Sequence, residues 1–181
     1  MGFGRVFEQT KGLEGGFSRD PDDNGNWTGG RKGLGELKGT KYGISAAQYP
    51  SFDIENLTLQ GARTIYFRDY WTPLGLDRIE SEPIGDEIFD TGGNMGRGTA
   101  VRIVQESVNF LEIGTPLVED GLVGPKTFER VYYWGRKDPE AFHKALNGFQ
   151  FMRYVEIVEN PTQEKFARGW MKRIQYYRGL P

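Results

Sequence analysis

Residues 9–20, QTKGLEGGFSRD, mark the point at which a predicted helix gives way to a glycine-rich loop. The i, i+3, i+4 spacing of one helix face is kept by Phe3, Val6, Phe7, the semi-polar Thr10 and Leu13. The pair Gly15–Gly16 then supplies positions without a Cβ atom, at which helices commonly end. The pattern therefore predicts a helix that stops at these two glycines.

Glu14 falls in the last turn of this predicted helix. The partial negative charge at a helix carboxyl end disfavours an ionised carboxylate, so we expect the pKa of Glu14 to be raised. A carboxyl group that stays protonated near neutral pH is what a general acid requires. The alternative interpretation is an ordinary surface glutamate beside a glycine turn.

Composition narrows the function classes. The chain has 181 residues, a formal net charge of −2, one histidine and no cysteine. The absence of cysteine excludes disulfides, zinc thiolate sites and cysteine nucleophiles. The charge balance argues against a basic surface for nucleic acid. We expect no metal site and no cofactor, and we interpret the single histidine, His143, as a surface residue.

The sequence contains no apolar stretch of the length that a membrane helix needs, and its amino terminus lacks the apolar core of a signal peptide. We therefore expect synthesis in the cytoplasm without membrane insertion. A protein with these properties that acts outside the membrane needs another route for its release.

The chain divides into two predicted parts at residues 91–98, TGGNMGRG, where glycines cluster. Within 1–91, residues 18–43 are rich in Gly, Asp and Asn and predict turns, with a short hairpin at TKYGIS, 40–45. Thr58 is a candidate N-cap for a helix that continues to Tyr70. Within 92–181, helix signals dominate, at Pro125, at Asp138–Pro139 and at 160–161. The predicted fold class is mainly α.

A second carboxylate close to Glu14 in sequence is available from three loop residues: Asp20, Asp22 and Asp23. The spacing does not choose among them, and we take Asp23 as the candidate. A calcium loop is an alternative for DPDDNGNWTGGR, but Arg31 stands where a bidentate glutamate is required. Asx turns need the same residue types. Thr40 and Tyr42 present hydroxyl groups on the hairpin, where both residues also suit a strand.

One aromatic stretch and one basic stretch each have two competing interpretations. YFRDYW, residues 66–71, places Tyr70 and Trp71 either in the core or along a sugar site, and aromatics at helical spacing are more often core. The carboxyl-terminal EKFARGWMKRIQYYR is either a solvated helix face or a basic patch for an anionic envelope.

Four blocks resemble the motifs of glycoside hydrolase family 108: EGGF at 14–17, TKYGIS at 40–45, ARTIYFRDYW at 62–71 and FDTGGNMG at 89–96. Phe17 replaces the Tyr that is usual in this family. The part that contains AVRIVQESVN, DGLVGPKTF and FARGWMKRI resembles a peptidoglycan-binding domain. The resemblance implies a lysozyme-like helical fold, with a glycoside hydrolase domain at 1–91 and a helical peptidoglycan-binding domain at 92–181.

The resemblance also implies an activity, an N-acetylmuramidase of the phage endolysin type that hydrolyses the β-1,4 bond between N-acetylmuramic acid and N-acetylglucosamine. Glu14 carries over as the catalytic acid, and Asp23 and Thr40 are candidates to assist it. Candidate substrate-binding residues are Tyr42, Tyr70, Trp71 and Asn94. The expected partner is the glycan strand of peptidoglycan, and we expect the protein to be a monomer. A lytic transglycosylase and a non-catalytic wall-binding or virion protein remain alternatives.

Overall fold

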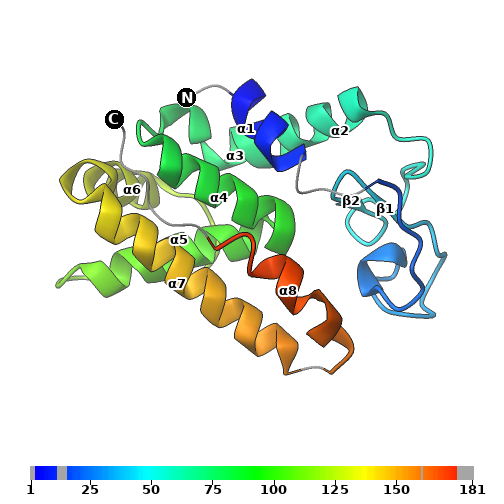
Figure 1. The fold of residues 1–181 in the computed structure, drawn as a ribbon. Helices are drawn as coiled ribbons and strands as arrows, with labels where there is room; N and C mark the ends of the chain where they lie inside the picture. Colours follow the sequence, from blue (N-terminus) through cyan, green and yellow to red (C-terminus); the bar gives the residue numbers. More distant parts are fainter. Residues whose placement is uncertain (1–2, 12–15, 160, 175–181) are drawn as a thin grey trace. The chain divides into compact units, whose positions relative to one another are not determined.

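The computed structural model describes residues 3–11, 16–159 and 161–174, drawn as a coloured ribbon in Figure 1. The chain forms two compact units, Phe3–Asp69 and the part from Tyr70 onward, and each is described by itself. Helices dominate the described residues, and their only sheet has two short strands. The predicted mainly α fold class is confirmed. The boundary that we place between residues 91 and 92 stays a prediction.

The first unit contains two helices, α1 (Phe3–Lys11) and α2 (Leu59–Tyr66), that pack through aromatic side chains. The rings of Phe7 and Tyr66 lie 5.8 Å apart between centroids, and those of Phe3 and Phe67 lie 5.1 Å apart. Thr58 caps α2, because its side-chain oxygen accepts a hydrogen bond from Gly61 N at 3.1 Å. The predicted N-cap is confirmed.

The predicted hairpin at residues 40–45 is confirmed. Its strands β1 (Thr40–Lys41) and β2 (Ile44–Ser45) pair antiparallel, with Thr40 opposite Ser45. The turn residues Tyr42 and Gly43 have φ angles of 52° and 74°. Positive φ at both central positions is the signature of a type I′ turn, whose twist matches that of the flanking strands.

A π-helix, η2 (Phe67–Trp71), follows α2 directly and leads into the short helix α3 (Thr72–Leu74). The predicted helix up to Tyr70 therefore exists but does not keep α-helical winding throughout. Gly75 ends α3 in the left-handed region, at φ 62°, and the 3-10 turn η3 (Leu76–Arg78) follows. A side chain would be strained at this φ, which explains the glycine.

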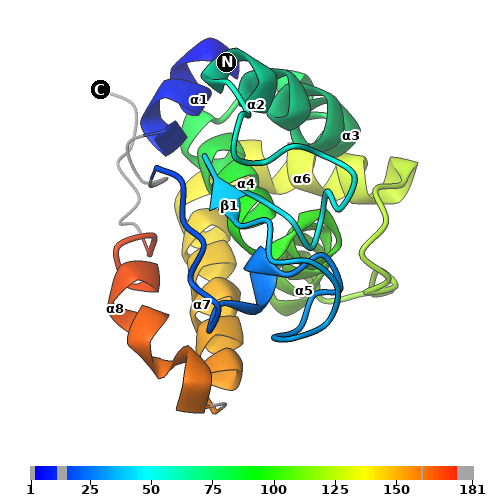
Figure 2. The ribbon, with the colours of Figure 1, turned by 90° about the vertical axis from the view of Figure 1, so that its right-hand side faces the viewer.

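The second unit is a helical bundle with four long helices: α4 (Glu82–Met95), α5 (Arg97–Leu111), α6 (Pro125–Lys137) and α7 (Pro139–Val158). In both ribbon views α7 runs beside α4 and α5, and these three pack on one another (Figure 2). The predicted helix starts are confirmed, because Pro125 opens α6 and Asp138 Oδ1 accepts from Ala141 N at 3.0 Å at the start of α7.

The core of this bundle is apolar along α5 and α7. Val101, Val104 and Val108 are buried on one face of α5, and Phe142 and Leu146 are buried on α7. Helices need such a face because short isolated helices are only marginally stable in water. Among the described residues, no helix combines the length and apolar character that crossing a bilayer requires.

The last described elements are the 3-10 helix η4 (Pro161–Phe166) and the short helix α8 (Ala167–Trp170). The helix predicted from residues 160–161 thus begins as a 3-10 segment. The basic stretch that begins at Glu164 is not uniformly solvated, because Arg173 is buried. Its Nη1 lies 2.5 Å from Oδ1 of Asp90 on α4, so this cation is neutralised inside the bundle.

Candidate active site

The candidate acid Glu14 and the predicted helix end at Gly15 lie outside the described residues. The described chain resumes at Gly16 and joins the hairpin at once. Ser18 N donates to Thr40 O at 2.8 Å, and Thr40 N donates to Ser18 O at 2.8 Å. The segment that follows Glu14 in sequence is therefore bonded along β1.

Thr40 occupies the middle position of a three-segment arrangement. Its backbone pairs with Ser18 on one side and lies opposite Ser45 of β2 on the other. The side chain is partly exposed. Within the described part of the chain, no hydrogen bond uses the Thr40 hydroxyl. A backbone held on both sides and an uncommitted hydroxyl suit the positioning of a water molecule.

Gly39 explains how closely Ser18 approaches the hairpin. Gly39 is buried with φ 90°, and a Cβ atom at this position would lie 2.5 Å from Ser18 O and 2.7 Å from Cε2 of Phe17. Real Cβ atoms are not found at such distances, so only glycine fits. Residues 18–43 contain many glycines, so the sequence alone did not distinguish Gly39 from the others.

Tyr42 is fixed by its backbone, not by its hydroxyl. Its carbonyl oxygen accepts a hydrogen bond from the hydroxyl of Tyr66 at 3.1 Å, which ties the hairpin turn to α2. Its ring is partly exposed, with Lys41 Nζ 5.6 Å from the ring centroid. The non-glycine positive φ at Tyr42 is uncommon and holds the ring at the turn.

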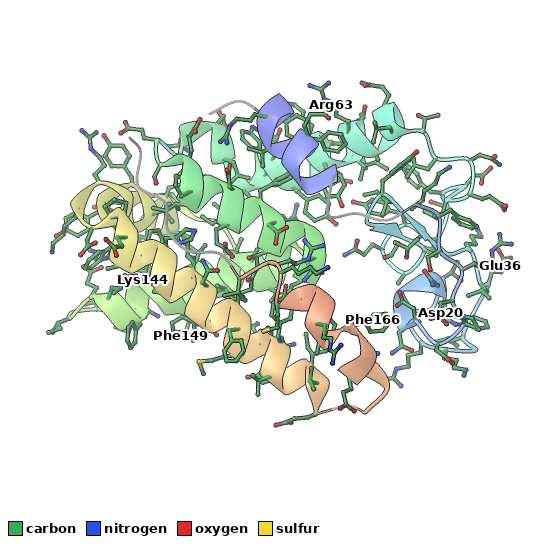
Figure 3. The ribbon with its side chains drawn as sticks, in the orientation of Figure 1. Asp20, Glu36, Arg63, Lys144, Phe149 and Phe166 are labelled. Carbon is green, nitrogen blue, oxygen red and sulfur yellow. The ribbon has the colours of Figure 1, made fainter. Side chains whose placement is uncertain are left out.

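The three loop aspartates each have a structural partner (Figure 3 labels Asp20). Asp20 Oδ1 accepts from Asp22 N at 2.9 Å, an Asx turn. Asp22 Oδ1 lies 2.6 Å from Lys32 Nζ, and this hydrogen bond raises the pKa of Lys32. Asp23 Oδ1 accepts from Gly25 N at 2.8 Å and caps the 3-10 turn η1 (Asn24–Asn26). Turn chemistry therefore accounts for Asp20 and Asp23, and an ion pair accounts for Asp22.

Asn26 organises the loop and was missed from the sequence. It is fully buried, and its side-chain Nδ2 donates to Asp20 O at 2.9 Å. Its backbone carbonyl oxygen accepts hydrogen bonds from Lys38 N and Gly39 N, each at 3.0 Å. Asn26 thus connects the aspartate turn with the residue before Thr40. An asparagine in a run of Asp, Asn and Gly carries no sequence signal that distinguishes this role.

The remaining candidates belong to the second unit. Tyr70 and Trp71 are buried, at 5% and 3% exposure, and the Trp71 ring meets Phe89 edge-on at 5.9 Å. Their burial favours the core interpretation, and their role in substrate binding stays a prediction. Asn94 Nδ2 donates to the hydroxyl of Tyr154 at 2.6 Å, so its amide holds a ring of α7.

A buried polar cluster links α4 and α7, and it corrects one expectation. His143 is 2% exposed, so its interpretation as a surface residue was wrong, and burial lowers its pKa. Glu87, buried beside it, accepts hydrogen bonds from Thr91 Oγ1 at 3.3 Å and Asn147 Nδ2 at 3.2 Å. Burial, followed by the charge of Asp90, raises the pKa of Glu87 to about 8. Glu87 is therefore largely protonated at neutral pH.

Metal ligation finds no support in the described ranges, where no three acidic or histidine side chains are grouped to hold an ion. In the DPDDNGNWTGGR loop, Asp22 is neutralised by Lys32, and the Asp20 and Asp23 carboxylates accept backbone hydrogen bonds.

Two family models match successive parts of the chain. Residues 7–96 match the family model described as glycosyl hydrolase 108, and residues 99–175 match one described as Predicted Peptidoglycan domain. No curated protein matches the sequence. Among solved structures, SagA of Brucella abortus is similar with a TM-score of 0.71 and 22% identity, over 95% of this chain and 88% of that chain.

The structural similarity establishes a shared fold, and the predicted lysozyme-like helical architecture is confirmed. The two family matches follow the order that the sequence blocks indicated. The combination of a glycosidase domain and a peptidoglycan domain supports a peptidoglycan hydrolase. Residues 7–96 therefore belong to the glycosyl hydrolase 108 family, and a peptidoglycan domain follows them at residues 99–175.

Proposed function

We propose that the protein is an N-acetylmuramidase of the endolysin type, which hydrolyses the β-1,4 bond between N-acetylmuramic acid and N-acetylglucosamine. It acts as a monomer on the glycan strands of the wall after its release from the cytoplasm of the producing host. The match of residues 7–96 to glycosyl hydrolase 108, a range that includes Glu14 and its EGGF block, carries this proposal.

In this mechanism Glu14 is the general acid. Its carboxyl proton passes to the glycosidic oxygen as the bond to the anomeric carbon breaks, and the leaving sugar departs as an alcohol. Water attacks the anomeric carbon from the opposite face and loses its proton to a basic group or to solvent. The reaction consumes one water and inverts the anomeric centre.

Thr40 positions the attacking water. Two observations support this role. Its hydroxyl makes no hydrogen bond within the described residues, whereas the three loop aspartates are engaged in turns or an ion pair. The backbone of Thr40 is also bonded to Ser18, four residues after Glu14. At about 3.5 Å per residue, the Cα atoms of Glu14 and Ser18 are at most about 14 Å apart.

The deciding experiment compares the wild type with Glu14→Gln, which keeps the side-chain shape and removes the acidic proton. Turbidity of purified peptidoglycan and the release of reducing ends are measured for both proteins. We expect the wild type to clear the suspension and Glu14→Gln to bind the wall without clearing it. Equal clearing by both proteins, or clearing by neither, contradicts the proposal.

The products separate hydrolysis from the related lytic reaction. In a lytic transglycosylase the 6-hydroxyl of the muramic acid attacks in place of water, so the product is an anhydro sugar. Mass spectrometry of the digest therefore distinguishes the two reactions by the mass of one water. A digest that consists of anhydro products overturns the hydrolase, and binding without any cleavage supports the non-catalytic alternative.

A further inference from the structure

A cavity of about 610 Å³ opens in the second unit between residues 78–81 and α6. Both walls belong to this unit, far along the chain from Glu14 and the hairpin. Its lining combines aromatic rings with charged groups: Arg78, Glu80, Phe128, Glu129, Tyr132 and Arg136. A mostly apolar hollow with a few charged groups is the usual form of a small-ligand site.

The cavity wall at Phe128 is preformed. A Cβ atom at Gly75 would lie 2.1 Å from Cζ of Phe128, so the ring packs directly on the glycine backbone. The guanidinium of Arg78 lies over the same ring, with Cζ 4.3 Å from the ring centroid. Gly75 precedes the turn η3 and Arg78 is its last residue, so the same turn positions both the glycine and the arginine against Phe128.

The charges of the cavity do not all cancel. Arg136 pairs with Glu80 at 3.5 Å, with its guanidinium carbon 5.1 Å from the Tyr132 ring centroid. Arg78 and Glu129, by contrast, make no ion pair with any described residue. One cation and one anion therefore line the same hollow without an ion pair to any described residue.

A guanidinium stacked on an aromatic ring keeps the donors along its edge for a carboxylate, and stacking limits the side-chain freedom lost on binding. The unpartnered Glu129 favours an ammonium group in the same ligand. A neutral sugar ring would use the aromatic faces but neither charge. The chemistry that matches all three features is a short peptide that bears both an amine and carboxylates.

We propose that this cavity binds the stem peptide of peptidoglycan, at a residue that carries a free amine and a free carboxylate, as a diamino acid does. Arg78 receives the carboxylate and Glu129 receives the ammonium group. This proposal rests on the proposed function, since it takes the wall as the partner, and it assigns the second unit a subsite for the peptide and not for the glycan.

The test is calorimetric titration of the full-length protein with two probes. The first is the disaccharide N-acetylglucosaminyl-N-acetylmuramic acid carrying a tripeptide that ends in a diamino acid, and the second is the same disaccharide without peptide. The proposed muramidase cleaves the bond at the anomeric carbon of N-acetylmuramic acid. In both probes this carbon is the free reducing end, so neither probe is cleaved. We expect Arg78→Met, whose methylene groups still cover Phe128, to bind the first probe about tenfold more weakly than the wild type. Arg97→Met, at the start of α5, is the matched control and should bind as the wild type does, because Arg97 is exposed and does not line the cavity.

A second variant tests the other charge. Glu129→Gln should weaken binding of the tripeptide probe but leave unchanged the binding of a probe whose amine is acetylated. Equal affinity of Arg78→Met and wild type, no binding by the wild type, or equal binding of the peptide-free disaccharide overturns the proposal. Wall cleavage with no binding of the tripeptide probe defeats this inference alone. Arg78-dependent binding without wall cleavage defeats the proposed function alone.

Discussion

Ser18 and Thr40 exchange both of their backbone hydrogen bonds, each at 2.8 Å, and this pair joins the segment after Glu14 to the hairpin. The pair exists because Gly39, next to it, has no side chain to push Ser18 away. The position of Ser18 beside the hairpin therefore depends on a backbone contact that only a glycine at position 39 permits.

Substitution at Gly39 should disrupt this contact. We expect Gly39→Ala to lower the free energy of unfolding by about 2–4 kcal/mol, since it adds both a positive-φ penalty and a clash with Ser18 O. Gly33→Ala is the matched control, because Gly33 has φ 79° but a Cβ atom there would meet nothing within 4 Å. Urea unfolding of both variants separates the clash from the backbone strain, and equal losses would contradict the argument.

The hydroxyl of Thr40 should matter for turnover and little for stability. We expect Thr40→Val to reduce kcat about 10²-fold or more, because the water loses its positioning group, while Thr40→Ser keeps most of the activity. Release of reducing ends from peptidoglycan measures both variants. A Thr40→Val enzyme as active as Thr40→Ser would remove Thr40 from the mechanism.

Asp23 should behave as a cap and not as a base. Asparagine is as good an N-cap as aspartate but cannot take up the proton of a water. Asp23→Asn should therefore retain activity, whereas Asp23→Ala should lose about 1 kcal/mol of stability with the cap to Gly25 N. Activity assays and thermal unfolding of the two variants check this. Loss of activity in Asp23→Asn at full stability would make Asp23 the second catalytic carboxylate.

The buried Glu87 predicts a pH dependence of stability. Its pKa is about 8 in the folded protein against 4.5 when exposed, so the folded state holds a proton that the unfolded state has released between these values. Stability contributed by this group is complete below about pH 4.5 and is lost as pH rises toward 8. The wild type should therefore lose stability from pH 5 to 8 relative to Glu87→Gln, a mimic of the protonated form. Urea unfolding at both pH values measures the difference, and a constant difference would contradict the prediction.

The sequence predicts helices well where their ends carry local signals. Thr58, Pro125 and Asp138 mark starts that the structure confirms, because capping depends only on neighbours in the chain. The hairpin at 40–45 was predictable for the same reason. The π-helical winding at Phe67–Trp71 was not, since no residue type there signals a change in winding.

Long-range packing was the part that sequence patterns could not give. The burial of His143 follows from a polar cluster shared by α4 and α7, whose members lie about 60 positions apart in sequence. The role of Asn26 depends likewise on carbonyl contacts with residues 38 and 39 across the loop. The Arg78 cavity combines residues before α4 with residues of α6, so no single stretch contains its pattern.

The buried pair of Asp90 and Arg173 has a consequence for biosynthesis. The two residues are 83 positions apart, so a ribosome adding about 5–20 residues per second makes Asp90 about 4–17 s before Arg173. During that interval the nascent α4 carries a carboxylate whose cation does not yet exist. The buried ion pair of the bundle can therefore form only after Arg173 has been synthesised.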